Sequence, residues 1–445
     1  MKSSTSLSPG QPPASGHAVL PATPEPATQA PAQPASGGRF ARLPHLAGRG
    51  FIPLGLFARL PLAMLTVGTL TLVTSNSGSY ALGGTAAGAV GLGSALGAPV
   101  LGALADRRGQ RPMLLWAAVL NTVAVVALIL AASAMGTSGS FPAAVLAAAF
   151  LSGASCPQVG PLARVRWMAL TSRGKAPDNR RDLDTALSYE STADEVTFVL
   201  GPALVGILAS LLAPWLPLAL AAAMTITLVP AFAAHRTHLA VPAARHAVPA
   251  AERLSRAKMP AAVALPVVAM VCMGTFFGST QAALSSFSAS YATSEIAGLL
   301  YAVMGLSSAA AALSVAYWPQ RFNLSWRWVV SAALMAGLAV LLLVPSSLGA
   351  MVAVLLILGV PVGPVMVTVF AVGGVLAPEG RLGTVMTALA SGIVAGTAIG
   401  SSLGGRLAQD HGYAAAFLVP ACAAAALALL GATAAVVLQR RSARR

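Results

Sequence analysis

The chain consists mainly of long apolar stretches separated by short polar ones. Each stretch is close to the roughly 20 residues that a helix needs to cross a bilayer. Twelve of them can be drawn, at 51–75, 81–104, 112–135, 141–164, 191–213, 215–234, 262–289, 297–318, 326–344, 350–376, 383–405 and 413–438. The pattern predicts an all-α, multi-pass membrane protein with twelve transmembrane helices.

The longest internal hydrophilic stretch, 235–261, separates six predicted spans from six. It is interpreted as a cytoplasmic central loop between an N-terminal six-helix bundle at 49–234 and a C-terminal one at 262–438. Residues 1–48 are rich in Pro, Ala, Gly and Ser, and such a segment has too little apolar surface to fold. It is predicted to be a disordered cytoplasmic tail, and residues 439–445 a basic one.

Charge is scarce and sorted along the chain. Only 9% of the residues are charged, against about a quarter in soluble domains. Of the 27 Lys and Arg, all but Arg59 and Arg406 fall in the tails or in the loops after even-numbered spans. Basic residues are retained in the cytoplasm, so both termini are predicted to be cytoplasmic, in the cell membrane. The same sorting explains the net charge of +15 without a nucleic-acid partner.

Several chemistries have no support in the sequence. Cys156, Cys272 and Cys422 lie inside apolar stretches and are predicted to be small buried hydrophobes rather than disulfides or metal ligands. No set of residues indicates a metal site or a catalytic triad, and no glycine-rich loop ends in Lys-Ser/Thr. Neither an enzyme nor an ATP-driven pump is therefore expected, and no cofactor.

A dense charged loop follows the second span, reading Gly-Ala-Leu-Ala-Asp-Arg-Arg-Gly-Gln-Arg at 102–111. It resembles the loop between the second and third helices of the major facilitator superfamily of secondary transporters. The resemblance implies a cytoplasmic gate in which the acid bridges to neighbouring helix ends. The gating residues would be Gly102, Asp106, Arg107, Arg108, Gly109 and Arg111. The alternative is that the arginines only fix the topology.

The fifth span contains Gly201 and Pro202, followed by Gly206. This segment resembles part of the antiporter signature of the same family, although Thr197 occupies an expected glycine position. Proline removes a helix hydrogen bond and glycine permits close packing, which predicts a bendable point. A tolerated packing kink is the alternative.

Proton coupling is predicted where charges enter the spans. Arg59 lies inside the first span, where an unpaired charge is costly, and Glu195 lies at a similar depth in the fifth. Arg59 is predicted to pair with Glu195 or Asp194, with Glu190 on the same helix face as Asp194. The alternative is that Arg59 extends to the membrane interface. The fourth span has no basic residue before Arg164, so coupling is expected through spans one and five, or the protein is a uniporter.

Polar residues at mid-span are the predicted substrate contacts. They are Gln158, Gln281, Thr66, Thr69, Ser279, Thr280, Thr368, Thr387 and Ser391. The two glutamines are favoured, because most Ser and Thr in membrane helices bond their own backbone. With almost no fixed charge expected at mid-depth, the predicted substrates are neutral or weakly charged.

The resemblance implies two bundles around a midplane cavity and transport by alternating access. The run Glu-Ser-x-x-Asp-Glu-Val at 190–196 is similar to efflux carriers of actinobacterial type. The expected function is export of a small drug or metabolite in exchange for protons, by a monomer. The alternatives are an importer or facilitator of a sugar-like solute and a membrane sensor or scaffold without transport activity.

Overall fold

The computed structural model describes residues 38–135, 142–172, 176–241, 260–292, 296–319 and 321–442. Residues 1–37 of the predicted N-terminal tail lie outside the described residues. The last part of this tail forms two short helices, η1 (Arg39–Arg42) and α1 (Leu43–Ala47). Leu43 and Ala47 are buried, so this part is packed against the bundle. Most of the central loop, residues 242–259, and residues 443–445 also lie outside the described residues.

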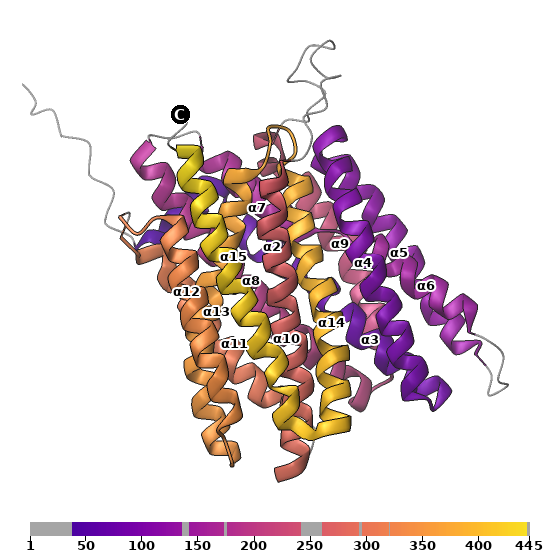
Figure 1. Ribbon diagram of the computed structural model, residues 1–445. Coiled ribbons are helices and arrows are strands. Elements are labelled where there is room, and N and C mark those ends of the chain that lie inside the picture. The colour runs from indigo at the N-terminus through magenta and orange to yellow at the C-terminus, as the bar shows by residue number, and fades with distance from the viewer. Residues whose placement is uncertain are drawn as a thin grey trace, which may run out of the picture. The chain divides into compact units, whose positions relative to one another are not determined.

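The first six spans form one bundle, called here the N-bundle (Figure 1). Its helices are α2 (Phe51–Ala58) and α3 (Leu60–Ser77), α4 (Tyr80–Arg108), α5 (Gln110–Ser133), α6 (Ala143–Ala154) and α7 (Val159–Thr171), α8 (Ala176–Leu211) and α9 (Leu216–Ala234). The first and fourth spans are thus each built from two helices. A short helix, η2 (Arg236–Ala240), follows α9.

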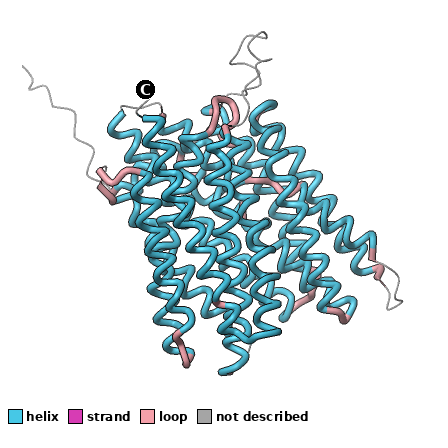
Figure 2. The backbone as a smooth tube through the Cα atoms, viewed as in Figure 1, coloured by secondary structure: helices cyan, strands magenta, loops and turns pink. Residues whose placement is uncertain are grey.

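The other six spans form the C-bundle. Its elements are η5 (Ala261–Val263) and α10 (Ala264–Tyr291), α11 (Ile296–Ser314) and η6 (Val315–Tyr317), α12 (Leu324–Ala339) and η7 (Val340–Leu343), α13 (Leu348–Leu376), α14 (Leu382–Ala416) and α15 (Leu418–Ser442). Figure 2 shows helices joined by short loops throughout the described chain. In the described part of the chain, twelve helices are long and apolar enough to cross a membrane, which confirms the predicted fold class.

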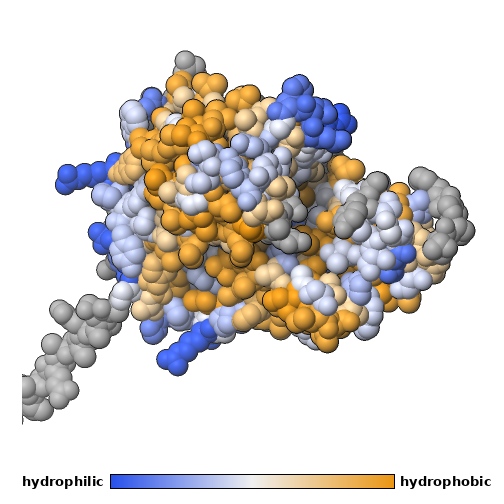
Figure 3. All heavy atoms as spheres, turned by 90° about the horizontal axis from the view of Figure 1, so that it is seen from below, coloured by the Kyte–Doolittle hydropathy of each residue, from blue (hydrophilic) through white to orange (hydrophobic). Residues whose placement is uncertain are grey.

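The surface of the helices is apolar, as lipid requires. On α5 the exposed large hydrophobics include Trp116, Leu120 and Leu130, and Figure 3, which views the molecule from below, shows hydrophobic residues over much of that end as well. Cys156 is buried, but Cys422 is exposed, so the prediction that all three cysteines are buried is wrong.

Three predicted spans have limits that are wrong by seven residues or more. The eleventh span ends at Ala416 rather than at 405, and the fourth and fifth are cut short at charged residues. The fourth span ends at Thr171 and the fifth begins at Asp178, not at 164 and 191. The extra turns carry charges that are buried against other helices. A boundary drawn at the first charge therefore cuts both spans short.

Glycines on α4 let it pack closely against α6. A Cβ on Gly93 would overlap the carbonyl oxygen of Phe150, whereas a Cβ on Gly88 would have no heavy atom within 4 Å. Replacing Gly93 with Ala is therefore expected to lower the free energy of unfolding by about 1–3 kcal/mol. Thermal unfolding in detergent measures this, with Gly88→Ala as the matched control on the same helix. Equal melting temperatures for the two variants would contradict the close packing.

The two bundles meet along a contact surface called here the seam. Five helices form most of it, α4, α7 and α8 from the N-bundle and α11 and α14 from the C-bundle. The polar contacts across the seam lie toward the end that carries the 106–111 loop, called here the basic face. In Figure 1 this face is uppermost, and the lower ends of α4, α5 and α6 diverge from those of α10 and α14.

Candidate functional site

Arg59 lies at the break between α2 and α3 in the first span. Pro61 follows at the start of α3, and its missing N–H weakens the helix at this point. The Arg59 side chain is 4% exposed, and its Nε donates to the carbonyl oxygen of Gly55 at 2.9 Å. The break and the guanidinium therefore form one unit, and the side chain points into the bundle rather than to the membrane interface.

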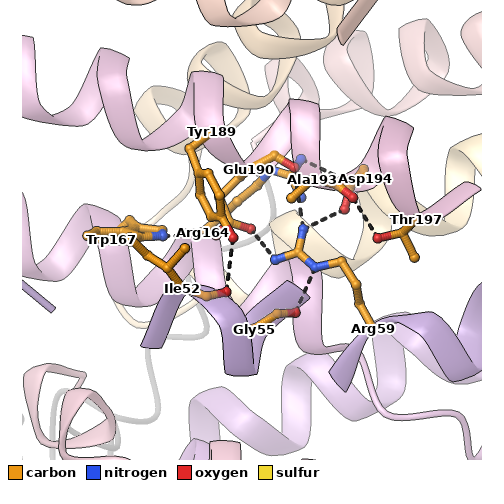
Figure 4. Close-up of polar contacts among 10 residues, drawn as sticks. All are labelled: Ile52, Gly55, Arg59, Arg164, Trp167, Tyr189, Glu190, Ala193, Asp194 and Thr197. Carbon is orange, nitrogen blue, oxygen red and sulfur yellow. Dashed lines mark hydrogen bonds and ion pairs between the residues drawn. The ribbon is translucent and has the colours of Figure 1, made fainter. Parts of the chain in front are cut away.

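Two acids on one face of α8 neutralise Arg59 (Figure 4). Arg59 Nη2 donates to Glu190 Oε2 at 2.7 Å, and Nη1 donates to Asp194 Oδ1 at 2.8 Å. Trp167 Nε1 donates to the other Glu190 oxygen at 2.9 Å. Buried charges at such distances need each other, because removing one leaves its partner uncompensated in a low-dielectric interior.

Arg164 of α7 completes the group. It is 0% exposed, and its Nη2 donates to Asp194 Oδ2 at 2.7 Å, so Asp194 bridges two guanidinium groups. Its guanidinium carbon lies 3.9 Å from the centre of the Phe370 ring on α13, which is a cation–π contact across the seam. Arg59, Arg164, Glu190 and Asp194 are called here the ion cluster.

This geometry corrects the prediction that the fourth span has no arginine at depth. α7 extends to Thr171, which places Arg164 well inside the span. Sequence analysis missed the residue because it assigned Arg164 to the cytoplasmic end. The i, i+4 spacing of Glu190 and Asp194 indicates a second buried cation beside Arg59, because two acids on one buried face need two cations.

Glu195 does not contact Arg59, so of the two partners predicted for Arg59 only Asp194 is in contact. Glu195 is half-buried, and Ser308 of α11 donates to its Oε1 at 2.8 Å. Nearby, the Thr192 hydroxyl donates to the Ala309 carbonyl at 3.1 Å. Glu195 therefore belongs to the seam between α8 and α11.

A second buried arginine, Arg166, joins α7 to three neighbouring segments. It donates to Gln110 Oε1 at 2.8 Å, to the Phe232 carbonyl at 2.8 Å and to the Thr237 hydroxyl at 3.0 Å. His235 lies beside it, outside the spans. Burial, and then the positive charge of Arg166, lower the pKa of the His235 imidazole. These partners are uncharged, so the role of Arg166 is structural.

A small cavity adjoins the ion cluster at the seam. Its volume is about 50 Å³, which is room for a few waters. Its charged lining residues are Arg59, Arg164 and Asp194. The expectation of almost no fixed charge at mid-depth is therefore wrong, and with it the argument for neutral substrates. Of the predicted substrate contacts, Gln158 and Ser391 line this cavity.

The other predicted substrate contacts do not line the cavity. Most are buried and bonded within their own helix: Thr69, Ser279, Thr368 and Thr387. Thr280 is buried and its hydroxyl has no partner among the described residues. Thr66 and Gln281 are exposed, so the preference for Gln281 as a buried amide is wrong.

The charged loop joins the bundles at the basic face. Asp106 accepts from the backbone N–H groups of Gly383 and Thr384 at 2.8 and 2.7 Å, and from the Thr384 hydroxyl at 2.7 Å. These donors lie at the N-terminus of α14, where a carboxylate also complements the helix dipole. A Cβ on Gly102 would overlap Thr387, so glycine is required for this approach. Gly109 has φ +94° and makes the sharp turn into α5.

The remaining predicted gating and bending residues have simpler surroundings. Arg107, Arg108 and Arg111 are exposed on the basic face. α8 continues through Pro202. A Cβ on Gly201 would overlap the Ala63 side chain on α3, while Gly206 faces open space.

An additional ion pair crosses the seam between α8 and α12. Arg327 of α12 donates from Nη1 to Asp184 Oδ2 on α8 at 3.0 Å, and both side chains are largely buried. On the surface, Arg42 pairs with Asp182 at 3.2 Å. Sequence analysis missed the cross-seam pair because Asp184 precedes the predicted fifth span.

Replacing Asp106 with Ala is expected to weaken the closed basic face. The three donors on α14 lose a charged acceptor, and hydrogen bonds to charged groups contribute about 1.5–3 kcal/mol each. The population open at this face should rise about tenfold or more. The labelling rate of a cysteine introduced at Ala309, in a background without native cysteines, measures it. The exposed Asp410 on α14 provides the control Asp410→Ala, and equal labelling rates in both variants would contradict the gate.

Twelve membrane-crossing helices in two bundles, with a charged cavity at their seam, are the arrangement of a secondary transporter. The chain belongs to the Major Facilitator Superfamily, whose sequence pattern it matches over residues 52–392 and, in a second match, 267–445. A comparison with curated protein sequences found no match.

Solved structures of similar fold cover most of the chain. The human organic anion transporter MFSD10 (TETRAN) has 19% identity and a TM-score of 0.64, over 89% of this chain and 100% of that one. A variant of the E. coli fucose:proton symporter FucP has 15% identity and a TM-score of 0.59, over 87% of this chain and 99% of that one. A bacterial homologue of the iron transporter ferroportin in an outward-facing state has 17% identity and a TM-score of 0.65, over 86% of this chain and 98% of that one. At such identities the likeness establishes the fold alone.

Proposed function

We propose that the protein is a proton-coupled transporter of a small organic compound, working as a monomer in the cell membrane by alternating access. The observation that carries this proposal is the ion cluster. Asp194 bridges Arg59 and Arg164 beside a cavity at the seam, and Arg164 also contacts the C-bundle through Phe370. A proton on Asp194 would release both guanidinium groups, and the change would reach the seam.

The basic face is proposed to lie in the cytoplasm, with both termini on that side. The distribution of arginines supports this orientation, and the conformation described is then the one closed to the cytoplasm. Asp106, Asp184 and Glu195 hold it closed in this proposal. Since ion pairs and hydrogen bonds at a seam can form in one state and break in the other, they bias two packings of similar energy.

The direction of transport predicted from the sequence is export in exchange for protons. Exchange requires that substrate and proton exclude each other, whereas cotransport requires that they bind together, and Asp194 is the proposed proton-binding group in either case. Efflux and uptake of a compound panel in inside-out vesicles, with and without an imposed proton gradient, test the proposal. Proton-dependent flux of any compound that is absent from vesicles without the protein supports the proposed function. Flux that is the same with and without the proton gradient contradicts proton coupling.

A further inference from the structure

Arg164 has hydrogen-bond donors that the ion cluster does not use. Its Nη2 donates to Asp194, whereas its Nε and Nη1 are buried without a hydrogen-bond partner among the described residues. Leaving buried donors of a charged group unsatisfied is unfavourable. The side chain lines the cavity, so these donors are available to an acceptor that enters it.

Two guanidinium groups converge on Gly160, which also lines the cavity. A Cβ on Gly160 would lie 3.7 Å from Nη1 of both Arg164 and Arg59. Its distance to Asp194 Oδ1 would be 3.2 Å. The absence of a side chain here leaves space between two positive groups.

The rest of the cavity lining is mostly apolar. It includes Leu62, Phe198, Phe370, Ile393 and Val394. The lining contains two guanidinium groups and one carboxylate, but Glu190 neutralises Arg59. Arg164, which shares Asp194 with Arg59, is therefore the positive group available to an anion, while the apolar part of the lining favours a hydrocarbon or aromatic body. Arginine is well suited to a carboxylate, because its planar group presents several donors in a fixed geometry.

We infer that the transported compound is a small amphipathic carboxylate whose anionic group binds Arg164, with Arg59 beside it. The inference rests on the proposed function, because it names the substrate class of the same site. The cavity of about 50 Å³ has room for the carboxylate group. The apolar body of the compound lies against the lining residues of α8, α13 and α14, which requires the seam to widen when the compound binds.

Proton binding and carboxylate binding reinforce each other in this arrangement. Asp194 contacts Arg59 from the α2–α3 break and Arg164 from α7. On its own helix, Glu190 shares Arg59 with it, and Glu195 is turned toward α11. The lining residues of α13 and α14 are uncharged. A proton on Asp194 frees Nη2 of Arg164 for the ligand, so the two bind together. This favours cotransport over the exchange predicted from the sequence.

Matched pairs of acids and amides test the inference on the purified full-length protein in nanodiscs. The probes are benzoate with benzamide and phenylacetate with phenylacetamide, titrated by calorimetry at about pH 6 and about pH 8, where both acids are ionised. Each acid is expected to bind at least about tenfold more tightly than its amide at both pH values. Amides that bind as well as the acids, or no binding by either acid at tens of millimolar, would overturn it.

Three variants locate the binding group. Arg164→Lys keeps a charge but loses the planar donors, and should weaken benzoate binding about tenfold. Gly160→Ala keeps every charge and fills the space between the guanidinium groups, and should weaken it several-fold. Arg166→Lys is the control, because Arg166 is buried on the same helix but does not line the cavity, and benzoate affinity should stay within about twofold.

The binding assay separates this inference from the proposed function, because it needs no proton gradient. Acid binding without proton-driven flux of any compound would contradict the proposed function and leave the inference standing. Proton-driven flux of a neutral compound by a protein that does not bind the acids would support the proposed function and contradict the inference.

Discussion

Replacing Asp194 with Asn is expected to abolish proton-driven accumulation while leaving the protein folded. Asparagine has the same size and can still accept hydrogen bonds from Arg59 and Arg164, but it carries no titratable proton. Arg59 retains Glu190 as its counter-ion. Arg164 loses its ion pair with Asp194 and keeps a neutral amide acceptor and its contact with Phe370, so some loss of stability is expected as well. In proteoliposomes with an imposed pH gradient, the accumulation ratio of the compound identified by the panel should fall to about one.

The control for this variant is Asp182→Asn on the same helix. Asp182 pairs with Arg42; the side chain of Arg42 is 53% exposed and that of Asp182 is 11% exposed. The pair is thus partly open to solvent and lies outside the ion cluster, so its loss should leave the cluster unchanged. Accumulation by the Asp182 variant should match the wild type. Accumulation by Asp194→Asn at the wild-type level would show that the proton is carried elsewhere.

Replacing Arg59 with Met is expected to have the largest effect on stability. It would leave Glu190 without its ion pair and Asp194 with one guanidinium instead of two. Removing one partner from a buried ion pair lowers the free energy of unfolding by about 3–5 kcal/mol. Thermal unfolding in detergent should show a large fall in melting temperature.

Two further variants check the cause. Arg107→Met removes an exposed arginine and should change the free energy of unfolding by less than about 0.5 kcal/mol. Adding Glu190→Gln to Arg59→Met should restore part of the lost stability, because it neutralises the acid left alone. A melting temperature of Arg59→Met equal to that of Arg107→Met would contradict the buried cluster.

The sequence predicts the spans well because lipid leaves few alternatives. A backbone that crosses hydrocarbon must satisfy its own hydrogen bonds, so long apolar stretches become helices. Errors appear where charges are buried against protein. Arg164 and Arg166 look like a cytoplasmic end, yet both lie inside the fourth span. Asp194 pairs with Arg164 there, and polar groups of α5, α9 and η2 accept hydrogen bonds from Arg166.

The site was predictable in part from helix geometry. Glu190 and Asp194 are four residues apart and share a face, and Arg59 needed a partner at its depth. The choice of Glu195 failed because the next residue on a helix points about 100° away. That rotation turns Glu195 toward Ser308 on α11 and away from Arg59.

The contacts across the seam were largely beyond the sequence. Asp106 was predicted to bridge to a helix end, but the sequence does not say that the end is that of α14. The pairing of Asp184 with Arg327, 143 residues away, depends on how the bundles dock. Neither residue belongs to a recognisable pattern.

The central claim is that the charge of Asp194 controls the seam. The most direct test is the distance between spin labels at Arg111 and Glu379, on opposite bundles at the basic face, in nanodiscs, measured for the wild type and for Asp194→Asn, whose neutral amide stands in for the protonated acid. The distribution for Asp194→Asn should be shifted from the short distance of the wild type toward a longer one, and Asp182→Asn should show the wild-type distribution. Equal distributions for Asp194→Asn and the wild type would contradict the claim.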